Sequence, residues 1–400
     1  MTQPFKSTRN ARFLVILLAG LAALSGCGRS EPARYHLNMV EMTDKGISAQ
    51  YQVEIATILE AMFGTPDEPF VLPETGLDIN KLRLASGPAW SDEEGTNHGL
   101  YRRHCAHCHG VTGDGAGPTA LFLNPYPRDY RQGKFKFKST ERAAQPTAHD
   151  LREILRQGIP GTAMPSFRLH PSREIDALVE YVKYLSMRGQ METALANFVM
   201  FQLGEGESLS QYANVYVDEL LSPIAEGWAG AEDQVIHPDP QLAPPPRNER
   251  DPEALAASIA KGRELFYGTK ANCLECHGPT ALGDGMTTDQ DDWSKAVKQF
   301  AANHDQVTPV ELGALPPRDV RPRNLRLGVF RGGRRPIDIY RRLHAGINGT
   351  PMPAVGPATP GATGTVTPDQ IWNLVDYVLS LPYDATTQEP ALLSNVRERL

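Results

Sequence analysis

Two copies of one pentapeptide carry the residues with the clearest chemistry. The first runs from Cys105 to His109 and the second from Cys273 to His277, and both have the form Cys-x-x-Cys-His. Two thiols at this spacing can form thioether bonds along one edge of a haem, and the adjacent histidine can bind the iron. The pattern predicts two covalently bound haem c groups, with iron as the metal. Their attachment and proximal residues are Cys105, Cys108 and His109 in the first copy and Cys273, Cys276 and His277 in the second.

Zinc is the alternative for a Cys-x-x-Cys pair. A structural zinc needs four ligands, and a histidine directly after the second cysteine cannot easily share one zinc with both thiols. The chain has five cysteines, and four of them lie in the two motifs, so no pair remains for a structural disulfide. The duplicated motif favours haem over zinc.

The chain around the two motifs repeats the same landmarks in the same order. After each motif come a Gly-Asp-Gly turn, a Pro-Arg pair, a Gly-Thr-x-Met-Pro loop and a helix with an apolar face. The last helix of the first copy follows Pro171 and Ser172, and that of the second follows Thr367. Between Met286 and Arg321 the second copy has extra residues, with one predicted helix from Trp293 to Ala301 and no assigned role.

The helical periodicity predicts an all-α fold with two tandem haem domains. We expect the first domain at 96–190 and the second at 251–385, joined by a partly helical, Pro-rich connector at 191–250. Residues 27–95 are predicted to form a tether with one helix, from Ile47 to Phe63, that packs on the first haem domain, and residues 386–400 a C-terminal tail. The expected helices include a short one near 100–104, a short one from Leu151 to Gln157 capped by Asp150, and one that starts at Pro252 and has Leu255, Ile259 and Phe266 on one face.

Both units resemble class I cytochrome c domains, in which a small helical shell holds the haem. The resemblance covers roughly 230 residues and implies a methionine sulfur as sixth iron ligand, 50 to 80 residues after the motif. Met164 lies 55 residues after His109, and Met352 lies 75 residues after His277. Each stands in a Gly-Thr-x-Met-Pro loop, so the resemblance implies His/Met ligation at both haems. The substitutes are Met187, Met191 and Met286.

The resemblance also suggests residues around the proximal histidines. A proximal histidine donates its second ring N–H to a carbonyl, which the resemblance places at Pro127 and Pro322. Arg128 and Arg323 are expected to pair with haem propionates, with solvated surface charges as the alternative. Three other histidines are interpreted as surface or packing residues, namely His104, His107 and His344.

The N-terminal residues predict export. A basic start is followed by about a dozen apolar residues from Phe13 to Leu24, too short to cross a bilayer as a helix. The run ends in Leu-Ser-Gly-Cys, which resembles a bacterial lipobox, so residues 1–26 are predicted to be a lipoprotein signal peptide and Cys27 the lipidated residue. An ordinary signal peptide is the alternative. We expect an exported protein of the cell envelope, lipid-anchored at the periplasmic face of a membrane.

These features together predict an electron-transfer protein rather than an enzyme. The formal charge of -7 argues against nucleic acid as a partner. The expected partners are redox proteins, with a quinol-oxidising complex or dehydrogenase as donor and an oxidase or soluble cytochrome as acceptor. Two alternatives remain, a dihaem cytochrome c peroxidase-like enzyme and a haem subunit of a larger membrane oxidoreductase complex.

Overall fold

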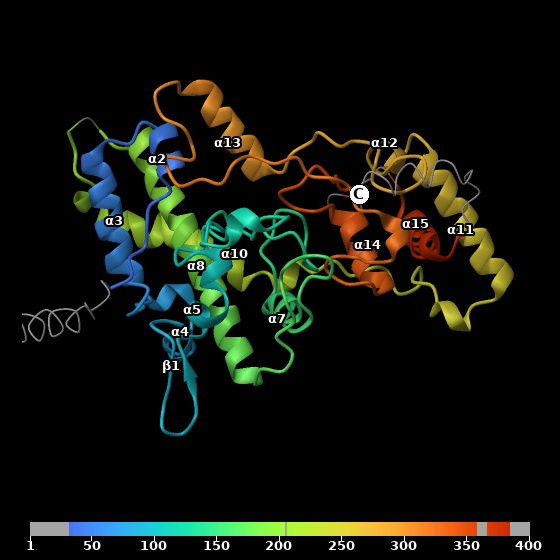
Figure 1. Ribbon diagram of the computed structural model, residues 1–400, viewed down its shortest axis with the longest axis horizontal. Helices are drawn as coiled ribbons and strands as arrows, with labels where there is room; N and C mark the ends of the chain where they lie inside the picture. Colours follow the sequence, from blue (N-terminus) through green and yellow to red (C-terminus); the bar gives the residue numbers. More distant parts are fainter. Residues whose placement is uncertain (1–31, 205, 358–365, 385–400) are drawn as a thin grey trace, which may run out of the picture. The chain divides into compact units, whose positions relative to one another are not determined.

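The computed structural model describes residues 32–204, 206–357 and 366–384. The predicted signal peptide, Cys27 and the predicted tail at 386–400 lie outside these ranges. The described part is all-α, as predicted (Figure 1). Its only named strands are the short antiparallel pair β1 (Trp90–Ser91) and β2 (Asn97–His98).

The described residues form two hydrophobic cores, which match the predicted duplication. The first core takes its buried side chains from residues between Met42 and Trp228. The second takes them from residues between Ile236 and Leu381. Each haem motif therefore belongs to a separate core.

Residues 35–95 are more than the tether with one helix that the sequence predicts. They contain α2 (Met39–Asp44), α3 (Ala49–Phe63) and α4 (Ile79–Ala85). Ser48 caps α3, and Ile55, Leu59 and Phe63 on its apolar side are fully buried in the first core. The segment is thus part of the first domain, because its buried side chains belong to the same core as those of the helices that follow it.

The first haem domain continues through α5 (Leu100–His104), α6 (Ala106–His109), α7 (Ala148–Gln157) and α8 (Ser172–Phe201). Helix α7 starts earlier than predicted, because Thr147 is its N-cap and Asp150 is the reciprocal partner in a capping box. Helix α8 runs across the boundary predicted at residue 190. In the predicted connector, α9 (Ala213–Val215), a π-helical turn at Tyr216–Leu221 and α10 (Ser222–Ala229) pack on the first core.

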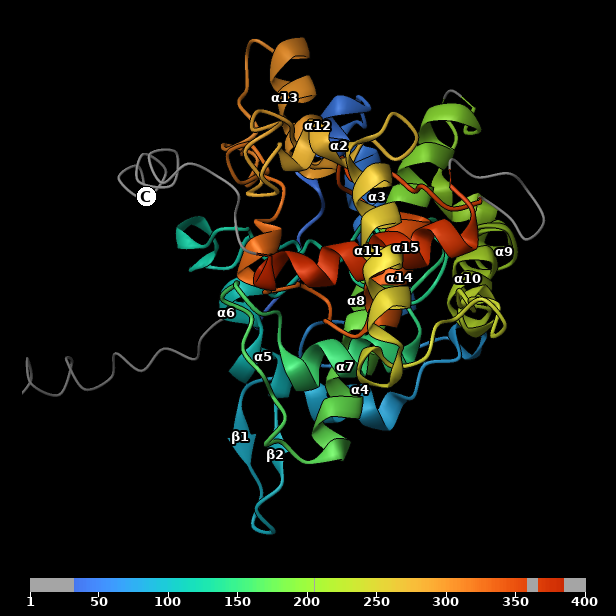
Figure 2. The ribbon, with the colours of Figure 1, turned by 90° about the vertical axis from the view of Figure 1, so that its right-hand side faces the viewer.

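The second haem domain follows the expected order. It contains α11 (Pro252–Tyr267), α12 (Cys273–His277), α13 (Asp292–Asn303), α14 (Pro336–Ala345) and α15 (Pro368–Ser380). Figure 2 shows α11 crossing α15. At this crossing a Cβ atom on Gly262 would lie 2.0 Å from the carbonyl oxygen of Asn373, so only glycine allows this close approach.

Candidate haem sites

Both predicted proximal histidines are oriented by the main chain. The Nδ1 atom of His109 lies 3.0 Å from the carbonyl oxygen of Arg128, and that of His277 lies 3.2 Å from the carbonyl oxygen of Arg323. A carbonyl only accepts, so each Nδ1 is the donor and each Nε2 keeps its lone pair for a metal. The prediction that Pro127 and Pro322 supply these carbonyls is wrong by one residue, because the chain turns so that the following arginine carbonyl faces the ring.

Burial keeps these imidazoles neutral. Removal from water lowers the pKa of His109 to about 4, and the hydrogen bond to Arg128 opposes this only in part. Burial also lowers the pKa of His277. The neutral imidazole is the form that binds iron, so both rings are in the state that an axial ligand requires.

An aromatic stack supports the first proximal histidine. The rings of His109 and Tyr130 lie 4.8 Å apart and nearly parallel, and Phe135 stacks behind Tyr130. In the second domain the nearest aromatic ring to His277 is Phe266 of α11, at 6.2 Å and tilted. The sequence analysis does not identify Tyr130 as a site residue, although its position two residues after Arg128 places it beside the carbonyl that orients His109.

The four motif cysteines are free thiols. Cys108, Cys273 and Cys276 lie on the short helices that carry the histidines, and Cys105 is the N-cap residue of α6. Burial raises the pKa of Cys105 and of Cys273 to about 12. Among the described residues, no three His, Cys, Asp or Glu side chains are arranged to hold a metal ion, which the zinc alternative requires.

A glycine turn closes each motif in the same way. Gly110 and Gly278 have φ values of 73° and 77°, and a Cβ atom on either would lie 2.1 Å from the carboxylate oxygen of Asp114 or Asp284. Glycine is therefore required directly after each proximal histidine. Six residues after each histidine, a glycine donates its backbone N–H to the histidine carbonyl: Gly115 to His109 and Gly283 to His277, both at 2.9 Å.

The two methionine loops have the same pattern of hydrogen bonds. In the first loop, the Thr162 hydroxyl accepts from the Met164 N–H at 3.1 Å and donates to the Ile159 carbonyl at 2.8 Å. In the second, Thr350 accepts from Met352 at 3.3 Å and donates to the Ile347 carbonyl at 2.8 Å.

Each loop is then closed by the isoleucine N–H, which donates to the methionine carbonyl at 3.1 Å in the first loop and 3.2 Å in the second. Met164 and Met352 are both partly buried against their cores. By contrast, Met187 and Met191 are buried within α8 as core residues. The duplicated loop distinguishes the two predicted ligands from these substitutes.

The arginines beside the proximal histidines have guanidinium groups that suit haem propionates. Arg128 lies 3.8 Å above the ring of Trp293, and burial lowers its pKa to about 10. Burial also lowers the pKa of Arg323, whose Nε atom has no hydrogen-bond partner among the described residues. Desolvated cations gain most from an anionic partner. The free histidine nitrogens, paired thiols, methionine loops and these arginines fit a haem at each site.

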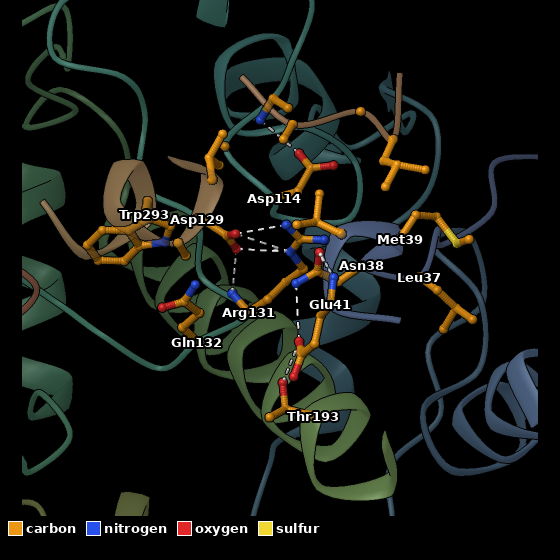
Figure 3. Close-up of a pocket in the computed structure, with 18 of the residues that line it drawn as sticks. Leu37, Asn38, Met39, Glu41, Asp114, Asp129, Arg131, Gln132, Thr193 and Trp293 are labelled. Atoms are coloured by element: carbon orange, nitrogen blue, oxygen red, sulfur yellow. Dashed lines mark hydrogen bonds and ion pairs between the residues drawn. The ribbon is translucent and has the colours of Figure 1, made fainter. Parts of the chain in front are cut away.

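A cavity of about 1190 Å³ lies beside the loop at residues 126–129, which carries Arg128, and between residues of α2, α8 and α13 (Figure 3). Asp129 and Arg131, joined by an ion pair of 2.8 Å, line it together with Asn38 and Trp293. None of the eight predicted haem ligands and attachment residues lines this cavity.

Comparison with known proteins agrees with this geometry in both halves. Residues 95–182 match the family model described as cytochrome c oxidase, cbb3-type, subunit III, and residues 259–382 match the model described as cytochrome c. No curated protein matches the chain.

One solved structure is similar, a chain titled Kuenenia stuttgartiensis reducing HAO-like protein complex Kustc0457/Kustc0458. It is 23% identical, covers 73% of this chain and 97% of its own length, and has a TM-score of 0.46. At this level of similarity it gives no indication of function.

Proposed function

We propose that this chain, a cytochrome c with two haem-binding domains, is a membrane-anchored carrier that passes single electrons between redox proteins of the cell envelope. A haem c at each site supplies one-electron chemistry at its iron when bound. The cytochrome c-type domains imply redox partners in general. A quinol-oxidising complex or dehydrogenase is the donor we propose, and an oxidase or soluble cytochrome the acceptor.

The repeated methionine loop is the observation that supports a carrier best. Both domains offer one neutral histidine and one methionine, held by matching hydrogen bonds. Two protein ligands leave no open position for a substrate, and a thioether favours the reduced iron. A peroxidase needs one site that opens to peroxide with an acid–base group above it. The duplicated loops favour the carrier over that alternative.

The membrane anchor is proposed from the sequence around Cys27. Among the residues that the structure describes, no helix is long and apolar enough to cross a membrane. Replacing Cys27 with serine should move the protein from the membrane fraction to the soluble periplasmic fraction. Recovery of that variant in the membrane fraction would instead support the complex-subunit alternative.

The carrier proposal is tested on the full-length protein, produced in a host that attaches c-type haem. We expect two haems per chain, two one-electron transitions at positive potential, and reduced protein that does not turn over hydrogen peroxide. Catalytic peroxide consumption, with one haem that binds small ligands, would replace the carrier with the peroxidase-like enzyme.

A further inference from the structure

Each methionine loop is also held by an arginine from the opposite haem domain. Arg142 belongs to the first domain, yet its guanidinium donates to the carbonyl oxygens of Met352 at 2.8 Å and Thr350 at 3.1 Å. Arg142 also lies within 3.5 Å of the carbonyl oxygen of Ala345 at the end of α14. It thus holds both sides of the second methionine loop.

The converse contact comes from the second domain. Arg331 donates to the carbonyl oxygen of Gly161, the first residue of the first methionine loop, at 3.1 Å. A Cβ atom on Gly161 would lie 3.1 Å from the guanidinium of Arg323, whose carbonyl orients His277. The first methionine loop therefore packs against the residue that anchors the second proximal histidine.

The insertion in the second domain adds an indirect link between the two domains. Trp293 packs against Gly349, the first residue of the second methionine loop, where a Cβ atom would lie 2.5 Å from the indole ring. The Trp293 ring also lies 3.8 Å from the guanidinium of Arg128, whose carbonyl orients His109. Ion pairs fix the start of α13 to the first domain, with Lys136–Asp291 at 3.1 Å and Lys134–Asp292 at 2.9 Å.

We propose that Arg142 and Arg331 are reciprocal positioning residues, each keeping the methionine ligand of the other domain in place. Arg142 binds main-chain carbonyls at more than one point, which fixes its loop better than a single contact, because a planar guanidinium loses little freedom on binding. Arg331 holds its loop through one hydrogen bond, to the carbonyl of Gly161. Each haem domain then has a complete ligand loop only when the other is docked against it. This inference rests on the proposed His/Met ligation and adds a role for the contacts between the domains, including the insertion whose role the sequence left open.

The test replaces one of the two positioning arginines at a time and follows iron ligation by one methionine at a time. The near-infrared band of Met–Fe(III) ligation reports the methionine bond directly. In full-length holoprotein carrying Met164→Ala only the second haem can show the band, and in protein carrying Met352→Ala only the first can.

We expect Arg142→Met to weaken methionine binding at the second haem by about tenfold or more, the usual effect of losing hydrogen bonds to a charged group. Arg331→Met should weaken it at the first haem. Neither arginine variant should weaken methionine binding at the haem of the domain that carries the substitution. Arg142→Lys keeps the charge but binds one carbonyl at a time, so it should restore part of the band. Arg331→Lys can keep the single bond to the Gly161 carbonyl and should restore most of it. Arg173→Met, an exposed arginine of α8, is the matched control and should leave both bands intact.

The outcomes separate this proposal from the carrier proposal. If the unmutated protein lacks the band at both haems, His/Met ligation itself is wrong. Suppose instead that both bands are present in the unmutated protein and remain in each arginine variant, or that a variant weakens only the methionine–iron bond of its own domain. Either result would contradict the reciprocal positioning by Arg142 and Arg331 and leave the carrier proposal intact.

Discussion

His109 donates a hydrogen bond of 3.0 Å to the main-chain carbonyl of Arg128, and this bond separates two roles that one arginine plays beside the haem site. The carbonyl orients the imidazole, while the guanidinium lies over Trp293. Since a side-chain substitution leaves the carbonyl in place, the charge can be changed without removing the support of the histidine.

Arg128→Met should therefore lower the reduction potential of the first haem without loss of its axial ligands. Removing a cation near the iron favours the more positive, oxidised form. The expected change is on the order of 1 kcal/mol, or about 40 mV for one electron. A redox titration followed at the two haems measures it, with Arg173→Met as the control. An unchanged potential at the first haem would place Arg128 outside its electrostatic reach.

The threonine of each methionine loop should stabilise the methionine bond. Thr162→Val and Thr350→Val keep the shape of the side chain and remove a hydroxyl that makes two hydrogen bonds. Each variant should lose about 1 kcal/mol of loop stability, so the Met–Fe(III) band of its own haem should disappear at lower denaturant. Thr57→Val removes a comparable hydroxyl bond within α3 and should not change either band. Equal effects of all three variants would contradict a specific role.

The sequence predicts the haem residues more fully than the way they are held. Motif spacing is local, so Cys105, His109, Cys273 and His277 are recognisable directly from the chain. The carbonyl that orients His109 comes from a turn 19 residues away, and only the folded backbone determines that Arg128 rather than Pro127 faces the ring. Local spacing cannot specify such a choice.

Individual contacts between distant segments cannot be predicted from the sequence pattern either. The helical periodicity of residues 47–63 predicts α3 and its packing on the first haem domain, but not which residues of that domain cover Ile55 and Leu59, which are fully buried. In the same way, the pattern predicts a helix near Trp293 but not its contact with Gly349. Periodicity identifies an apolar face without identifying what covers it.

The crossing of α11 and α15 should be the position in the second domain that is most sensitive to added volume. Gly262→Ala places a methyl group 2.0 Å from the Asn373 carbonyl, so the helices must separate. We expect a loss of about 1–3 kcal/mol in the free energy of unfolding of this domain. Gly227→Ala in α10 is the control, because nothing lies within 4 Å of its added methyl group. That variant should be stabilised by about 0.5–1 kcal/mol, and a neutral Gly262→Ala would contradict the close crossing.

Glu174 should give the first domain a stability that depends on pH. Burial raises the pKa of Glu174, but the hydrogen bonds from His170 and Asn97 lower it, and the lowering effects together outweigh the effect of burial. The pKa of this carboxyl therefore lies below its ordinary value. A carboxylate with a lowered pKa stabilises the fold above its unfolded pKa of about 4.3, and this contribution is lost as the pH falls below that value.

Glu174→Gln should therefore cost about 1–3 kcal/mol at neutral pH and progressively less in acid. Unfolding by urea at several pH values measures this difference, with Glu153→Gln on α7 as the control. A cost that does not change with pH would indicate a packing role for Glu174 instead of a charge-dependent one.

The most direct test of two His/Met-ligated haems is an optical redox titration of the full-length holoprotein, repeated with Met164→Ala and with Met352→Ala. For His/Met ligation at both haems we predict two transitions at positive potential, each with a Met–Fe(III) band, and each methionine variant should lose one band and lower one potential. A haem that lacks the band in the unmutated protein, has a low potential and reacts with peroxide would contradict it.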